Sequence, residues 1–427
     1  MKAWRMMHAA LRLGFVGILL AWSAAVAAET NRGFDPERLG RLDALIQDHI
    51  DRGQLAGAVM YVARDGGTVR LRPYGWQDLE GGRPMRADTI FRLASMSKAV
   101  TTVAALMLYE EGRFALNDPV SRYLPAFAQP VVAVAPPAGS APEVKYVTVP
   151  ARNPITIRDL MRHTAGLTYG SGLASDDYKQ AGLFGWYFAD RDETIGEAVN
   201  RLARLPLHGH PGEAYQYGFA TDVLGHLVEV VSGQPLDQFI ESRIARPLGM
   251  KDTCFFLPPE KGGRLATVYG LRNGVLGRGD QGAYVTGPRK CFSGGAGLLA
   301  TVGDYARFLQ MLLNEGELEG ARLLSPTTVR LMHANQAGGT FEGGRRDFGL
   351  GFWVNNHPGA YGEAIGAGAY GWGSAYFPEY LVDPHERVVA IFMAQLLPAG
   401  GLDLAHRAKN LVYQALVEPA ESPPRVP

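Results

Sequence analysis

The chain has 427 residues, of which 47% are hydrophobic and 20% are charged. These values are ordinary for a globular protein, and the length suits a single catalytic unit made of two lobes. Lys plus Arg and Asp plus Glu both total 42, so the formal net charge is zero. This balance gives no reason to expect nucleic acid or an anionic membrane surface as a partner.

The N-terminus resembles a secretory signal peptide. Lys2, Arg5 and Arg12 precede an apolar run over residues 13–26, and a small-x-small cleavage site ends at Ala27. A transmembrane anchor is the alternative, but the run is shorter than the roughly 20 residues that span a bilayer. We therefore predict a signal peptide over residues 1–27, export to the periplasm or the medium, and no stable membrane insertion after cleavage.

The predicted elements place strands near both ends of the chain and helices between them. Apolar spacing predicts a helix over residues 36–50, and a hairpin follows around Asp65-Gly66-Gly67. Residues 129–152, rich in Pro, Ala and Val, are interpreted as a surface excursion. The remaining predictions are helices over 95–112, 195–205, 219–232, 236–245, 302–314 and 402–417, and strands over 58–63, 68–74, 380–382 and 388–393.

This distribution predicts an α+β fold in which helices flank an antiparallel sheet. The sheet lobe would comprise about residues 28–92 and 288–427, and a mostly helical lobe, about 93–287, would be inserted between them. The cysteines, Cys254 and Cys291, leave two possibilities open. Export favours one disulfide, whereas two buried thiols would act as small hydrophobic residues.

Ser95-Met96-Ser97-Lys98 is the first candidate for chemistry, because residues three apart at a helix start lie on the same face. A serine hydroxyl needs a base before it can act as a nucleophile, and a lysine can be that base where burial lowers its pKa. Taken alone, such a short motif arises easily by chance and favours an N-capping serine and a surface lysine. Tyr217, before a predicted helix, and the glycine-rich segment 369–376, before a predicted strand, are further candidates.

Several segments, in order along the chain, carry a resemblance to a known family. The sequence resembles the serine β-lactamase and penicillin-binding-protein superfamily. Within it, the chain is most similar to class C β-lactamases and family VIII carboxylesterases. The segments that carry the resemblance are Ser95-Met96-Ser97-Lys98, Leu116-Asn117-Asp118-Pro119, His163-Thr164-Ala165-Gly166-Leu167, Pro247-Leu248-Gly249-Met250 and Ser293-Gly294-Gly295.

The resemblance implies a role for particular residues. Ser95 matches the acylated serine, Lys98 the lysine of the first motif, and Tyr217 the tyrosine of Tyr-x-Asn, which relays protons. Trp372-Gly373-Ser374 falls where class C enzymes carry Lys-Thr-Gly and would bind substrate. The backbone N–H of Ala375 would form the oxyanion hole together with that of Ser95.

Three departures from the family pattern bear on the substrate. Phe219 replaces the asparagine of Tyr-x-Asn, Trp372 replaces the motif lysine, and Ser374 replaces the usual last glycine. The first two remove an amide and a cation that would bind a β-lactam. We therefore expect a serine carboxylesterase for short neutral acyl esters, with weak β-lactam hydrolysis at most.

Other functions remain as alternatives or find no support. A class C-like β-lactamase, a D-amino-acid peptidase, or a penicillin-binding sensor that is acylated without turnover are the alternatives. His208-Gly209-His210 resembles a fragment of a metal motif but lacks further ligands at suitable spacing, and His163 is interpreted as structural. The expected reaction needs no metal or cofactor, only a small-molecule ester or β-lactam substrate, and the oligomeric state stays open.

Overall fold

The computed structural model describes residues 31–420, so the predicted signal peptide lies outside the described residues. An eight-stranded antiparallel sheet forms the centre, and its strands come from both ends of the described chain. This confirms the predicted α+β fold, whereas the boundaries of the two lobes stay a prediction. In spatial order the strands are β12 (Asp347–Phe348), β13 (Trp353–Asn355), β14 (Ala369–Gly373), β15 (Glu379–Asp383), β16 (Val388–Ala394), β1 (Gly57–Arg64), β2 (Gly67–Asp78) and β3 (Arg83–Pro84).

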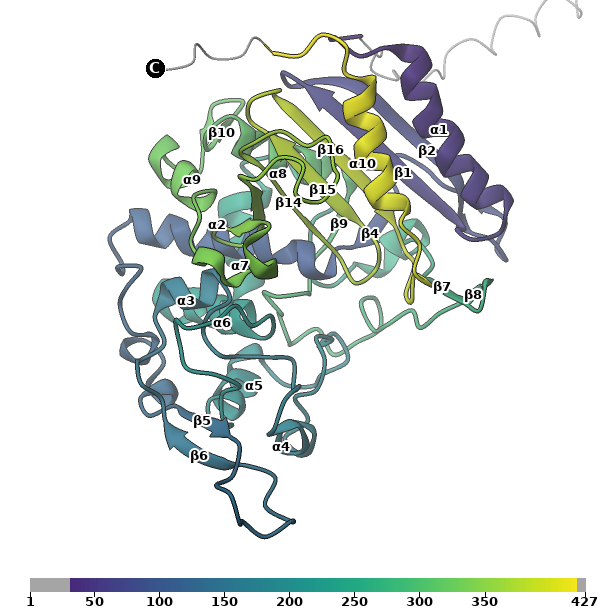
Figure 1. Ribbon diagram of the computed structural model, residues 1–427. Coiled ribbons are helices and arrows are strands. Elements are labelled where there is room, and N and C mark those ends of the chain that lie inside the picture. The colour runs from purple at the N-terminus through teal and green to yellow at the C-terminus, as the bar shows by residue number, and fades with distance from the viewer. Residues whose placement is uncertain (1–30, 421–427) are drawn as a thin grey trace, which may run out of the picture.

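Helices cover both faces of this sheet. Figure 1 shows α1 (Pro36–Asp51) and α10 (Leu404–Ala415) side by side over one face, and α8 (Val302–Leu313) packs on the other. Successive side chains of a strand point to opposite faces. Thus Ala390 and Phe392 of β16 join the α1 and α10 core, whereas Val389 and Ile391 join the core that contains α8. Burial on both faces explains why β16 is apolar along its whole length.

Most of the helices lie between β4 and β9 along the chain. Helix α2 is buried through its first three turns, as the apolar residues around it predicted. In residues 31–420, no helix combines the length and the apolar character that crossing a membrane requires. These helices are α2 (Ser97–Glu110), α3 (Ile157–Met161), α4 (Ser175–Gln180), α5 (Ile195–Leu202), α6 (Ala220–Ser232) and α7 (Leu236–Ile240), and α9 (Pro326–Met332) follows α8.

Several short strand pairs were not predicted. The segment interpreted as a surface excursion contains a hairpin of β5 (Val131–Val134) and β6 (Val147–Pro150). A second hairpin joins β7 (Tyr269–Arg272) and β8 (Val275–Arg278) through Asn273-Gly274, a turn signal that was missed. The remaining pairs are β4 (Ile90–Arg92) with β9 (Leu299–Thr301), and β10 (Glu317–Leu318) with β11 (Ala321–Arg322).

The disulfide prediction is wrong, because Cys254 and Cys291 are both free thiols. The two thiols have different surroundings. Cys254 Sγ donates to the Asp252 carbonyl, 3.9 Å away, and the charge of Arg289 acts on it, whereas Asp222 acts on Cys291. Burial raises the pKa of Cys254 to about 12. Cys291 is buried and Cys254 is partly buried, so the structure is close to the alternative of two buried thiols that the sequence had left open.

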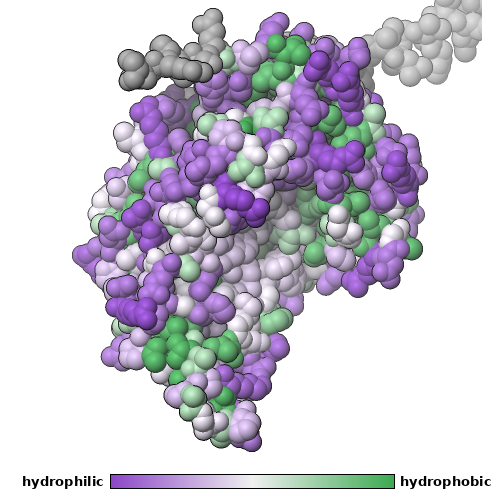
Figure 2. Space-filling model, in the orientation of Figure 1, coloured by the Kyte–Doolittle hydropathy of each residue, from purple (hydrophilic) through white to green (hydrophobic). Residues whose placement is uncertain are grey.

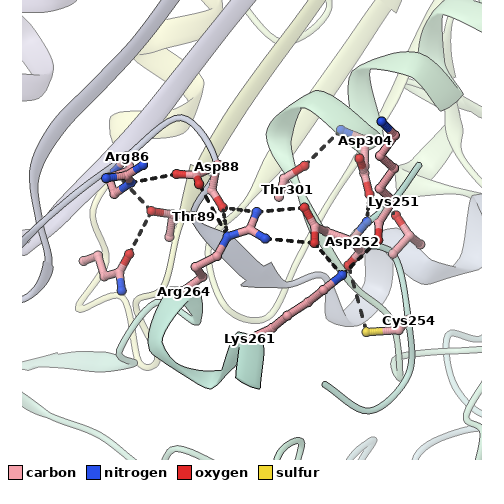
Figure 3. A network of polar contacts seen from close by, with 12 residues as sticks. Arg86, Asp88, Thr89, Lys251, Asp252, Cys254, Lys261, Arg264, Thr301 and Asp304 are labelled. Carbon is pink, nitrogen blue, oxygen red and sulfur yellow. Dashed lines mark hydrogen bonds and ion pairs between the residues drawn. The ribbon is translucent and has the colours of Figure 1, made fainter. Parts of the chain in front are cut away.

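A polar network ties the start of α8 to the segment before β7 (Figure 3). Asp252 accepts hydrogen bonds from both Arg264 Nη atoms at 2.9 and 2.7 Å and from Lys261 Nζ at 2.8 Å. Its backbone N–H donates to Asp304 Oδ2 at 2.7 Å. Partial burial opposes ionisation, but the bonds from Arg264 and Lys261 outweigh it and hold the pKa of Asp252 below its ordinary value.

We expect Asp252→Asn to lower the free energy of unfolding by about 1–2 kcal/mol at pH 7, the scale of hydrogen bonds to a charged group. A depressed carboxyl pKa stabilises the folded state above about pH 4 and loses that effect as the pH falls through the folded pKa. The difference between the two proteins should therefore shrink between pH 5 and pH 3 in urea unfolding. Equal differences at both pH values would contradict this assignment.

The exposed pair Lys290–Asp192 provides a matched control. The Asp192 side chain is 72% exposed, so its ion pair is screened by water. Asp192→Asn should change the free energy of unfolding by less than about 0.5 kcal/mol.

Candidate active site

Ser95 lies at the point where β4 turns into helix α2. The strand runs into a 3-10 turn, Ala94–Met96, and α2 begins at Ser97. Ala94 has a φ of +38°, an uncommon backbone conformation for a residue other than glycine. Ala94 and Met96 are fully buried, whereas Ser95 is half-buried. The turn thus leaves the Ser95 hydroxyl accessible next to the helix N-terminus.

Lys98 is the second residue of α2, three residues after Ser95, and is almost completely buried. Its Nζ donates to the Gly295 carbonyl at 2.7 Å and to the Tyr169 hydroxyl at 3.0 Å. The same Nζ lies 4.6 Å from the centroid of the Tyr217 ring. Nζ is therefore held by two neutral oxygen atoms and an aromatic face.

Tyr217 reaches Ser95 although 122 residues separate them. Its hydroxyl donates to Ser95 Oγ at 2.7 Å. The Gln216 N–H donates to the His163 carbonyl at 2.7 Å, and this hydrogen bond holds the residue before Tyr217 in place. A Cβ at Gly218 would lie 2.4 Å from the Leu167 carbonyl oxygen, so only glycine allows this approach. The motif 163–167 thus acts as a backbone support for Tyr217.

Aromatic rings surround the Tyr217 side chain. Its ring centroid lies 4.9 Å from that of His163 and 5.6 Å from those of Tyr169 and Trp372. Phe219 is 1% exposed and packs on Tyr169 at 4.9 Å. Phe219 therefore supports the ring of Tyr169 from within the core. Its predicted contact with substrate stays a prediction.

Burial decides the protonation of two groups in this cluster. It lowers the pKa of His163 well below its ordinary value, and the charge of Lys98 lowers it further. Burial also raises the pKa of Tyr169 well above its ordinary value, and the neighbouring Tyr217 raises the pKa of Tyr169 further. At neutral pH His163 is therefore an uncharged imidazole, in keeping with a structural role, and Tyr169 is a protonated phenol.

Gly295, whose carbonyl binds Lys98, is itself held through its N–H by the buried side chain of Asp222. Asp222 Oδ1 accepts from Ser293 Oγ at 2.5 Å and from the Gly295 N–H at 3.1 Å. Burial raises the pKa of Asp222, against the hydrogen bond from Ser293 and the charge of Lys98. Tyr169 and Asp222 were not among the predicted site residues, because each lies inside a segment whose local pattern shows only a loop or a helix.

The segment 372–375 forms the end of β14 and the turn after it. Trp372 is half-buried and its ring lies 5.4 Å from that of Phe348, besides its contact with Tyr217. Ser374 Oγ accepts from the Tyr376 N–H at 3.2 Å, so this hydroxyl stabilises the turn. Gly373 and Ala375 are half-buried. The roles of Gly373 and Ser374 in substrate binding, and of Ala375 in an oxyanion hole, stay predictions.

Comparisons with known proteins identify the family of the chain. Residues 42–414 match the family model described as beta-lactamase. The chain belongs to the beta-lactamase family. It is 36% identical over 385 residues to protein Rv1367c of Mycobacterium tuberculosis, covering 85% of this chain and 91% of that protein. It is 35% identical over 366 residues to esterase EstB of Burkholderia gladioli, covering 80% and 86%.

A solved structure extends the likeness to the fold. EstCE1, a hydrolase with promiscuous acyltransferase activity, has a TM-score of 0.76 and 27% identity, covering 89% of this chain and 98% of that one. The family match and these two esterase-type relatives show that the protein is a serine hydrolase of the esterase and β-lactamase type. The family model, matched over residues 42–414, includes the positions of Ser95, Lys98 and Tyr217.

Proposed function

We propose that the protein is a carboxylesterase that hydrolyses short neutral acyl esters through an acyl-enzyme on Ser95. The observation that carries the proposal is the Tyr217 hydroxyl 2.7 Å from Ser95 Oγ, with Lys98 Nζ against the same tyrosine ring. A nucleophile within hydrogen-bond reach of an oriented group that can relay its proton is the arrangement that covalent catalysis requires. The likeness to esterase EstB supports the same class of reaction.

In this mechanism Ser95 Oγ attacks the ester carbonyl carbon. Its proton passes to the Tyr217 oxygen while the phenol proton of Tyr217 passes to Lys98, which acts as a neutral amine, and the negative oxygen is stabilised by the N–H groups of Ser95 and Ala375. The pair returns the proton to the leaving alcohol oxygen as the C–O bond breaks, which leaves the acyl group on Ser95. A water molecule then attacks the acyl carbon and gives a proton to the same pair, which returns it to Ser95 Oγ as the acyl–Oγ bond breaks and the acid leaves.

The surroundings of Ser95 favour neutral substrates. A β-lactam carries a carboxylate that must leave water on binding, and hydrogen bonds to a charged partner are about twice as strong as neutral ones. Trp372 stands where the resemblance places a lysine, and its ring packs on Tyr217. Phe219, in place of the family's asparagine, offers no amide. Because Trp372 brings no positive charge and Phe219 brings no amide, the carboxylate and side chain of a β-lactam lose two binding partners, and neutral esters are favoured.

We expect kcat/KM for p-nitrophenyl acetate or butyrate to exceed that for nitrocefin and benzylpenicillin by about 10²–10⁴-fold. This is the scale of losing one charged and one neutral hydrogen bond. Trp372→Lys should narrow the gap, because it restores a cation at the expected place. Trp372→Phe is the control, since it shortens the ring system without adding a charge.

Three results would favour other functions. Faster turnover of nitrocefin than of the short esters would favour the β-lactamase alternative, and turnover of D-amino-acid amides would favour a peptidase. A stoichiometric acyl-enzyme that persists without release would favour a penicillin-binding sensor. We further propose, from the N-terminal pattern alone, that the protein acts after export, in the periplasm or the medium.

A further inference from the structure

A cavity of about 750 Å³ lies between the β7–β8 hairpin and the turn that follows β14. This volume falls within the range of small-molecule binding sites. The mechanism proposed above uses none of the residues that line it. Figure 2 shows apolar side chains gathered on the side of the molecule where Figure 1 places β7 and β8.

One face of the hairpin forms a wall of this cavity. Residues directly opposite each other in an antiparallel pair share a face, and residues two apart along a strand share it too. Gly270 pairs with Gly277 and Arg272 pairs with Val275, so these four positions share one face. All four line the cavity. The two glycines leave that wall without side chains, and a Cβ added at Gly277 would meet no atom within 4 Å.

The facing walls are aromatic and apolar. The ring of Trp186 meets that of Tyr376 edge-on at 5.4 Å, and both line the cavity. Val275 is 69% exposed and Leu397 is 37% exposed, and both belong to the lining. Apolar side chains grouped around a hollow and open to water indicate a surface that a ligand covers.

Two residues of the cavity lining, Tyr376 and Trp186, pack together with neighbours of the catalytic serine. Ala94, which precedes Ser95, packs in one apolar cluster with Tyr376, and Trp186 and Ala375 pack against that cluster. The buried Arg92 holds the surroundings in place: its Nη atoms donate to the carbonyls of Ala266 at 2.6 Å and Gln281 at 2.7 Å. The cavity lining is therefore linked by packing to Ala94, which precedes Ser95, and to Ala375, the residue expected in the oxyanion hole.

The charges at the rim do not select a charged ligand. Arg278 is paired with Asp78 and Glu80, both at 3.1 Å. Arg272 and Asp280, which also line the cavity, carry opposite charges. The aromatic and aliphatic side chains of the walls therefore select the ligand, and they favour an apolar group.

From this geometry we propose that the cavity is a subsite for a large uncharged apolar group of the ester substrate, an aromatic or branched aliphatic group. The proposal rests on the proposed function and extends it, because the substrates would include esters that carry such a group besides a short chain. The group can belong to the acyl or to the alcohol part, and the chemistry of recognition is the same for both.

The test compares three esters by pH-stat: ethyl acetate, ethyl 3-phenylpropanoate and 3-phenylpropyl acetate. Burying a phenyl group should raise kcat/KM by about 10–100-fold over ethyl acetate. The ester that gains identifies whether the acyl or the alcohol part enters the cavity. Gly277→Leu, which adds a side chain on the cavity face, should remove most of that gain, and Trp186→Ala should reduce it.

Gly263→Leu provides the matched control, because Gly263 is exposed, lies outside the cavity lining, and its added Cβ meets no atom within 4 Å. This variant should keep the full gain. A gain that survives Gly277→Leu, or equal rates for all three esters in the wild type, would overturn the subsite. Ester hydrolysis that persists in Ser95→Ala would instead overturn the proposed function, so the two failures are distinguishable.

Discussion

Ser95→Ala should lower kcat for p-nitrophenyl butyrate by about 10⁶-fold, the loss seen when a serine hydrolase loses its nucleophile. It should also abolish covalent labelling by a fluorophosphonate. The reason is positional as well as chemical. Ser95 is half-buried at the start of α2, and its Oγ accepts the hydrogen bond from Tyr217. Intact-protein mass spectrometry, followed by peptide mapping, measures the label.

Ser97→Ala is the matched control within the same motif. Ser97 is fully buried and its Oγ accepts from the Leu298 N–H at 3.0 Å, so it serves the packing of α2. This variant should be less stable and should still be labelled on Ser95. A probe found on another serine of the Ser95→Ala protein would show that the nucleophile has been misassigned.

Tyr217→Phe and Lys98→Ala should each lower kcat by about 10²–10⁴-fold, the usual contribution of general acid–base catalysis. Tyr217→Phe is the sharper of the two. It removes the hydroxyl that bonds to Ser95 while keeping the ring between His163, Tyr169 and Trp372. KM should change little, because substrate does not bind through that hydroxyl before the reaction starts.

Tyr178→Phe tests whether removing the hydroxyl of any buried tyrosine lowers kcat as much as Tyr217→Phe does. Tyr178 is buried, and its hydroxyl donates to the Pro206 carbonyl at 3.0 Å. This variant should cost stability and keep kcat within about threefold, since surface and core changes outside a site act mainly through folding. Tyr217→Phe with a kcat equal to that of Tyr178→Phe would rule out the proton relay. Stopped-flow measurement of the p-nitrophenol burst separates acylation from deacylation in each variant.

The success of the sequence analysis depended on how local each signal was. The apolar spacing in residues 36–50 predicted α1, and Leu39, Leu42 and Ile46 are buried as that spacing required. The hairpin around Asp65-Gly66-Gly67 was found for the same reason. The hairpin of β5 and β6 was missed, because its strands are four residues each and alternate weakly, so pairing across a long loop decides them.

Contacts between distant segments were beyond the reach of local patterns. The disulfide prediction failed because spacing along the chain says nothing of how near two thiols lie, and Cys254 and Cys291 face different neighbours. Asp222 looked like an ordinary helical residue of α6. Its importance for Lys98 depends on Ser293 and Gly295, some 70 residues later.

The sequence by itself determined the class of fold, through residue periodicity and the placing of strand signals at both ends of the chain. It also determined which residue types are available for chemistry, because a serine and a lysine three apart on a helix share a face wherever that helix lies. Only the tertiary structure decided that Tyr217 meets Ser95, that Trp372 packs on Tyr217, and that a cavity forms against the β7–β8 hairpin. Those contacts form when helices and sheet bury apolar surface against each other, and the free energy of that burial depends on the whole arrangement rather than on any one segment.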